Sequence, residues 1–430
     1  MDTMHELQQL VVAQKMGIKH GICSVCSGSP FVLEAALLQA KETGTSVLIE
    51  ATANQVNQFG GYTGQTPADF FHTMEKRAEV MGFPRERLLL GGDHLGPVAW
   101  QKEPAVDAMA KAETLVHDFA AAGYTKIHLD ASMPLADDTD LTTEEIARRA
   151  AFLCKAAERG AAEYHETHPD ALRPVYVIGS EVPTPGGAGD EEGLAVTKPQ
   201  DLLMMLAIFE KEFKDNGLND AWKRVVAAVV QPGVEFGNDS VHSYVPEEAA
   251  ELTKIAQTIP QIVLEGHSTD YQTEADLRNM VEDGIAILKV GPALTFAARE
   301  ALYALSYIED ALAFRKPSGF RDVLEEAMLE DPKNWRGHYT QKEPLAKQLR
   351  MFSYSDRSRY YMTAPQVHAA QKKLFSNLKK TEIPLSMLSQ YLPVQYQKVR
   401  NGELENAPRA LVLDKVREVL QVYWKACGLV

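Results

Sequence analysis

The chain has 430 residues, of which 45% are hydrophobic and 24% charged, and its formal net charge at pH 7 is -15. This length accommodates a large core, while the acidic balance argues against binding to nucleic acid or to an anionic membrane. No apolar run is long enough for a membrane span and the first residues lack a secretory pattern, so we expect a cytoplasmic protein.

Short apolar segments alternate with helical patterns over the first 300 residues. We predict strands near residues 20–25, 46–50, 87–92, 124–130, 174–180, 224–230, 261–265 and 285–290. A helix is predicted from Pro30, and others over 104–121, 142–160, 198–214, 246–257 and 273–282. This alternation predicts a (β/α)8 TIM barrel, in which the active site gathers at the C-terminal ends of the strands.

The alternation stops after about residue 300. Helical patterns follow over 301–314, 319–329, 363–377, 385–392 and 409–426. We therefore predict a barrel over residues 1–300 and a helical C-terminal extension over 301–430, packed on the barrel. The extension either covers the barrel mouth or forms a subunit interface of a homo-oligomer, and the sequence does not choose between them.

Ionisable side chains follow several predicted strands. Asp93 and His94 end the third strand, and His267 follows the seventh. Two histidines and a carboxylate from separate strand ends form a common divalent-metal set, and a nearby free aspartate can transfer protons. A single histidine at such a position is more often a hydrogen-bonding group, but the pair among carboxylates favours a metal. The first strand, with Cys23 and Cys26, looks structural.

Other candidate residues keep alternative interpretations. The polar, glycine-rich loop at 54–64 favours contact with a hydroxylated ligand. For Lys289 three roles remain open at this point: a Schiff base with a ketone, phosphate binding, or neutralisation of a carboxylate. Glu50 and Glu181 alternatively cap helices or pair with Lys289. Two further arginines stand among aromatic residues and either bind phosphate or join a surface ion-pair network; they are Arg357 and Arg359.

At these positions the chain resembles a known family. The segments HGICSVCSGSP, LIEATANQVNQFGGYTG, LLLGGDHLGP, EGHSTDYQT and FSYSDRSRYY are similar to those of the KbaZ/GatZ family, and the likeness runs nearly end to end. That family is described as the non-catalytic subunit of class II tagatose-1,6-bisphosphate aldolase. Some members act as tagatose-6-phosphate 4-epimerases, while others carry an older kinase label, for which the sequence contains no phosphate-cradling loop.

The resemblance extends distantly to class II aldolases, which are metal-dependent barrels, and it implies a role for each candidate residue. A divalent metal (Zn, Mn or similar) is expected on His94, Glu235 and His267, where Glu235 replaces the histidine expected at the sixth strand. Asp93 and Glu181 are the expected proton-transfer pair. Sugar hydroxyls are expected to meet Glu50, Gln55, Asn57 and Asp130. The phosphate is expected to meet Ser268, Thr269, Lys289, Arg357 and Arg359.

Two functions follow from the resemblance. The first is 4-epimerisation of D-tagatose 6-phosphate to D-fructose 6-phosphate by a retro-aldol cleavage of C3–C4 and recapture of the aldehyde on its other face. The second is a non-catalytic subunit that stabilises the catalytic chain of a tagatose-bisphosphate aldolase. A complete set of ionisable strand ends favours the first, because a scaffold has no physical need for it.

Overall fold

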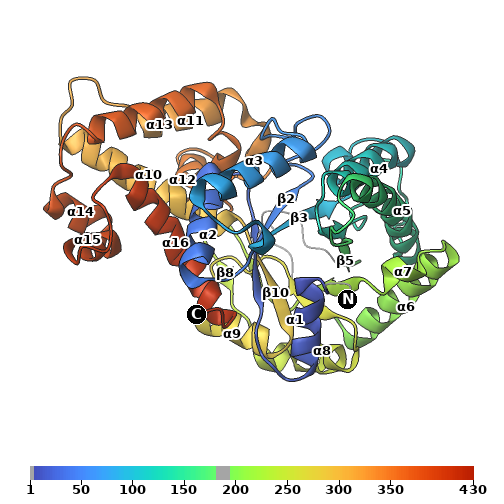
Figure 1. The fold of residues 1–430 in the computed structure, drawn as a ribbon. Coiled ribbons are helices and arrows are strands. Elements are labelled where there is room, and N and C mark those ends of the chain that lie inside the picture. Colours follow the sequence, from blue (N-terminus) through green and yellow to red (C-terminus); the bar gives the residue numbers. More distant parts are fainter. Residues whose placement is uncertain (1–3, 181–193) are drawn as a thin grey trace.

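The computed structural model describes residues 4–180 and 194–430, and its centre is a closed barrel (Figure 1). Eight parallel strands of this described part follow one another around the barrel in the order β1-β10-β9-β6-β5-β4-β3-β2. Their bounds are β1 Ile22–Cys26, β2 Val47–Thr52, β3 Leu88–Leu95, β4 Lys126–Leu129, β5 Val175–Ile178, β6 Val225–Val230, β9 Val263–Gly266 and β10 Ile285–Val290. The predicted TIM barrel and its strand positions are thus confirmed.

Helices follow the strands around the outside of the barrel. They are α2 Pro30–Thr43, α3 Pro67–Met81, α4 Ala105–Ala121, α5 Thr143–Thr167, α6 Pro199–Asp215, α7 Asn219–Trp222, α8 Pro246–Thr258, α9 Glu274–Glu282 and α10 Pro292–Ala311. Several of these helices have proline in the first turn. Proline is suited to this position because a backbone N–H there would have no acceptor within the helix. The helices predicted from the sequence are found within a few residues of their expected bounds, with two exceptions. Helix α5 runs seven residues past 160, and α10 begins at Pro292, ahead of the predicted start at 301.

The N-terminal end of the barrel is closed by a helix that the sequence did not predict. Helix α1 (Glu6–Lys15) buries Leu7, Leu10 and Val11 against the inward side chains of the strand beginnings. His5 caps this helix, because its Nδ1 accepts a hydrogen bond of 3.1 Å from the backbone N–H of Leu7. The lower barrel is therefore a dry apolar core, and any chemistry is left to the opposite end.

The extension is helical, as expected. After α10 it contains α11 Phe320–Glu330, α12 Leu345–Phe352, α13 Pro365–Leu378, α14 Leu385–Tyr391, α15 Pro393–Arg400 and α16 Pro408–Ala426, with the short 3-10 turn η4 Arg357–Tyr360 before α13. The expected division after residue 300 falls inside α10. Figure 1 shows α11 and α13 side by side next to the barrel.

The last helix returns to the barrel. Helix α16 packs against α2, α9 and α10, so it lies between helices that follow the first and the last strands. From α16 the Tyr423 hydroxyl donates to the backbone oxygen of Thr269 at 2.7 Å. No described helix is both long and apolar enough to cross a membrane.

Candidate active site

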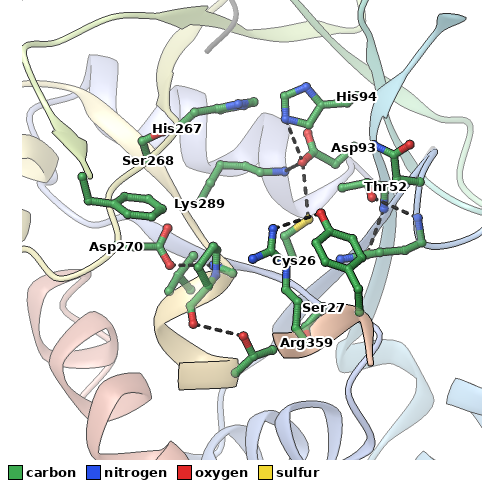
Figure 2. A pocket seen from close by; sticks show the side chains of 18 of the residues that line it. Cys26, Ser27, Thr52, Asp93, His94, His267, Ser268, Asp270, Lys289 and Arg359 are labelled. Carbon is green, nitrogen blue, oxygen red and sulfur yellow. Dashed lines mark hydrogen bonds and ion pairs between the residues drawn. The ribbon is translucent and has the colours of Figure 1, made fainter. Parts of the chain in front are cut away.

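A cavity opens at the C-terminal ends of the strands, where the active sites of (β/α)8 barrels lie (Figure 2). Its lining includes seven of the residues that were expected to act on a ligand: Gln55, Asp93, His94, His267, Ser268, Lys289 and Arg359. The extension contributes to this wall, because Arg359 and Tyr360 belong to η4. The extension therefore completes the cavity, and this observation favours the first of its two expected roles.

Asp93 and Lys289, which line the cavity, belong to a buried layer of paired charges. Lys126 Nζ is 2.8 Å from Glu265 Oε2 and also contacts Glu50. Lys289 contacts the same Glu50 and lies 2.7 Å from Asp93 Oδ2. All five side chains are buried. Because their strands are neighbours or face one another inside the closed barrel, charges far apart in the chain meet at one level.

The pairing fixes the protonation of this layer. Burial favours the neutral form of Lys289, but Asp93 and Glu50 outweigh it and raise the pKa of Lys289 well above its ordinary value. Burial likewise opposes ionisation of Asp93, yet His94 and Lys289 hold the pKa of Asp93 well below its ordinary value. A lysine kept protonated cannot attack a carbonyl, so the structure favours carboxylate neutralisation over Schiff-base chemistry at Lys289.

Three imidazole rings face one another above this layer. The ring centroids of His94, His128 and His267 are 4.9 to 5.3 Å apart. Each ring has an acidic partner: His94 Nδ1 is 2.8 Å from Asp130, His128 Nδ1 is 2.9 Å from Asp93, and His267 Nε2 is 3.0 Å from Glu265.

These environments shift the pKa values of His94 and His267 in opposite directions. Burial lowers the pKa of His94, but Asp93 and Asp130 reverse the effect, so the net shift is upward. At His267 burial dominates over Glu265 and lowers the pKa to about 4. His267 is therefore a neutral imidazole near neutral pH, which is the form that binds metals, while His94 keeps its second proton to higher pH than an ordinary imidazole does.

The donors suit a divalent cation. Within the described residues, one group has ligand atoms that all lie within 4.8 Å of one another: Asp93, His128, Glu265 and His267. His128 Nε2 is buried without a hydrogen-bond partner, and a nitrogen in that state is available for a metal. The carboxylates of the centre also outnumber its two lysines, so negative charge remains for a cation to balance. The mixed imidazole and carboxylate set fits Zn or Mn.

The backbone is strained at two positions of the cavity wall. His94 and Ser268 have φ angles of 46° and 53°, in the left-handed region that side-chain-bearing residues rarely adopt. Such conformations persist only where the surrounding structure enforces them, and they concentrate at functional sites. His94 is the second-last residue of β3 and Ser268 lies two residues beyond the end of β9, so the strain turns the chain where it meets the cavity.

Some expected ligand contacts are not brought into the cavity. Glu235 lies on the antiparallel ribbon of β7 (Glu235–Phe236) and β8 (Val241–His242), and its carboxylate accepts the N–H of Phe236 at 2.9 Å. Among the described residues, the ligand atoms of His94, Glu235 and His267 do not come close enough together to share a metal ion. The group that does so contains His128 and Glu265 together with His267 and Asp93. Glu181 lies outside the described residues.

Five other expected contacts serve the protein itself and do not line the cavity. The Asn57 side chain bonds its own loop, at Ala53, Phe59 and Gly61. The Thr269 hydroxyl donates to the backbone oxygen of Lys289 at 2.6 Å. The remaining three are buried against other side chains. Glu50 contacts two lysines, Asp130 contacts His94, and Arg357 contacts His338 and Tyr360.

Sequence reasoning also missed contributors. The sequence places His128 and Asp130 on one face at the end of the fourth strand, but no metal role was expected for His128. Lys126, two residues before His128 on the same strand, extends this inward-facing ionisable row. Cys26 lines the cavity, with its Sγ 3.4 Å from Asp93 Oδ2, so the first strand is more than structural. Tyr62 and Tyr360 line it as well.

A (β/α)8 barrel with a buried, charge-paired cavity at its strand ends is the class of protein that fold and site define. The chain belongs to the GatZ/KbaZ-like family, described as D-tagatose-1,6-bisphosphate aldolase subunit GatZ/KbaZ-like, whose model matches residues 7–428. It is similar to a crystal structure of a probable tagatose 6 phosphate kinase from Sinorhizobium meliloti 1021. That pair shares 45% identity over 95% of this chain and 100% of the other, with a TM-score of 0.85.

More distant structures also match. The YdjI aldolase from Escherichia coli K12 shares 14% identity over 87% of this chain and 94% of the other, with a TM-score of 0.41. A fructose-bisphosphate aldolase from Campylobacter jejuni shares 15% over 88% and 95%, with a TM-score of 0.43. At this level of similarity neither structure carries an argument about activity.

Proposed function

We propose that the protein is a metal-dependent 4-epimerase that interconverts D-tagatose 6-phosphate and D-fructose 6-phosphate. The observation that carries the proposal is the buried group of Asp93, His128, Glu265 and His267 beside the cavity. Inversion at C4 of a 2-ketose cannot proceed by simple enolisation, because the C4 hydrogen is not adjacent to the carbonyl carbon. Cleavage and re-formation of the C3–C4 bond achieve it, and this chemistry needs a base and charge stabilisation.

His128, Glu265 and His267 would hold the cation, which leaves a coordination position open for substrate. A divalent cation held there supplies polarisation of the C2 carbonyl and stabilises the enediolate. Asp93 is the base that takes the C4 hydroxyl proton, because its carboxylate lines the cavity and is ionised. His94, oriented by Asp130, donates a hydrogen bond to the sugar.

The phosphate would lie against Arg359 and Ser268, which line the cavity. Arg359 is a permanent cation with a planar set of donors that suits phosphate oxygens. Lys289 also lines the cavity, but its positive charge is neutralised by Glu50 and Asp93. The local positive charge matters because the chain as a whole, at -15, repels an anionic substrate.

The family description supports a second function. The matched model is that of an aldolase subunit, so the chain would stabilise a separate catalytic chain and do no chemistry. The purified protein, loaded with Zn or Mn, is incubated with fructose 6-phosphate and assayed for tagatose 6-phosphate. Product that disappears in Asp93→Asn supports the epimerase. No product, together with a raised melting temperature of an added aldolase chain, supports the subunit.

A further inference from the structure

Tyr360 places a phenol in the cavity between two guanidinium groups. Its oxygen accepts hydrogen bonds from Arg357 Nη1 at 3.2 Å and from Arg359 Nη2 at 3.1 Å. The guanidinium carbons lie 5.6 and 4.6 Å from the ring centre. In Figure 2, Arg359 reaches the cavity beside Cys26, and a dashed line joins its guanidinium to a phenol oxygen.

The neighbouring Tyr62 shows what the arginines change. The two rings meet edge to face with centroids 4.8 Å apart, and both line the cavity. Burial raises the pKa of Tyr62, whereas at Tyr360 the same burial is outweighed by Arg359 and Arg357, which lower the pKa below its ordinary value. Two adjacent phenols thus have opposite shifts, and Tyr360 is the stronger acid.

The positive charges cannot swing away from this phenol. Arg359 Nη1 donates to the backbone oxygens of Ser355 and Asp356, at 2.7 and 2.9 Å. Asp356 has a φ angle of 27° and pairs with Arg299 at 3.0 Å, so the start of η4 is anchored to α10. Arg357, on its far side, contacts His338. The cluster is built to hold charge at one oxygen, which is the arrangement that acid–base catalysis requires.

We propose that Tyr360 is the catalytic acid that protonates the C4 oxygen after the sugar fragment is recaptured. The inference rests on the proposed epimerase function. Inversion turns the C4 oxygen away from the group that deprotonated it, so a second proton-transfer group is needed on another wall. Asp93 belongs to the barrel wall and Tyr360 to the extension.

The step balances as follows. Asp93 takes the C4 hydroxyl proton, and the C3–C4 electron pair remains on the ketone fragment as an enediolate. After the aldehyde rotates, that pair forms the new C3–C4 bond, and the C4 alkoxide takes the proton of Tyr360. The phenolate is held by Arg357 and Arg359, and exchange with solvent moves one proton from Asp93 and returns one to Tyr360.

The kinetic test uses the full-length, metal-loaded protein. Tyr360→Phe is expected to lower kcat at least about 100-fold with little change in KM, and to abolish the alkaline limb of the kcat profile. Tyr391→Phe, at a half-exposed tyrosine on α14, is the control and keeps both. An active wild type whose Tyr360→Phe variant retains kcat and the limb overturns the inference alone, whereas an inactive wild type overturns the proposed function and the inference with it.

A second variant keeps the phenol. Arg357 does not line the cavity, and Arg357→Gln removes one of the two charges on Tyr360. The near-ultraviolet phenolate absorbance of substrate-free protein should show one tyrosine ionising before the others, absent in Tyr360→Phe. In Arg357→Gln this ionisation and the alkaline limb are expected to move together to higher pH. A limb that stays in place while the ionisation moves overturns the inference.

Discussion

Lys126 and Glu265 form an ion pair of 2.8 Å across the barrel interior, and neither side chain has any solvent exposure. Lys126 also contacts Glu50, so a single ammonium serves two buried carboxylates. The Lys211–Asp215 pair, by comparison, is exposed to solvent, whereas the Lys126–Glu265 pair stands below a cavity and holds its charge without solvent. The arrangement makes Lys126 a structural support of the site above it.

Replacing Lys126 by Met is expected to destabilise the protein by about 3–5 kcal/mol, because Glu50 and Glu265 each lose a buried cationic partner. The free energy of unfolding from urea titration measures the effect. Lys211→Met is the control, since the Lys211–Asp215 pair is exposed and its loss should leave the midpoint unchanged. An equal response of both variants would contradict a special role for Lys126.

Acidification is expected to weaken the helix that closes the lower barrel. Burial lowers the pKa of His5 to about 4, below its unfolded value of about 6.5. The stabilisation from the neutral cap is complete above the unfolded value and is lost as pH falls toward 4, by about 3 kcal/mol at that pH. His5→Asn keeps a cap acceptor without this titration, so its unfolding free energy should fall less over the same range. Identical acid sensitivity in both proteins would refute the assignment.

A side chain at position 91, in place of Gly91, is expected to destabilise the protein. A Cβ built there lies 3.0 Å from Glu50 Cγ and 3.2 Å from Lys126 Cβ. Gly91→Ala would push on the paired charges and should cost roughly 1–3 kcal/mol of stability, as overpacking of a filled core does. Gly337→Ala is the matched control, because nothing lies within 4 Å of its Cβ. Thermal melting of the two variants checks the prediction, and equal melting temperatures would contradict it.

Metal binding is expected to follow the clustered donors. His128→Ala and His267→Ala should each weaken binding of Zn or Mn by at least about tenfold. Glu235→Gln should leave affinity unchanged, because Glu235 is not part of that group. Calorimetric titration of the metal-free protein measures this without any assay of activity. Loss of affinity in Glu235→Gln with retention in His128→Ala would instead support the set predicted from the sequence.

The barrel was predictable because buried parallel strands and amphipathic helices leave different periodicities in the sequence. The cavity was predictable in part, because the C-terminal ends of barrel strands converge. This convergence brings Asp93, His94, His267 and Lys289 together. The pairing of Lys126 with Glu265 was not, because the two are joined only by closure of the barrel. Tyr360 was missed because nothing local shows where a 3-10 turn of the extension meets the barrel.

The cavity depends on residues that are synthesised after the barrel strands. The last barrel strand ends at Val290, whereas the residues that finish the cavity, Arg359 and Tyr360, are synthesised later and α16 later still. Domains generally fold as units, and α16 packs against α2, α9 and α10, so these barrel helices gain their last packing partner only when the C-terminal helix has been made. Both the cavity wall and the helix that packs against α2 and α10 are therefore supplied by the part of the chain that is made last.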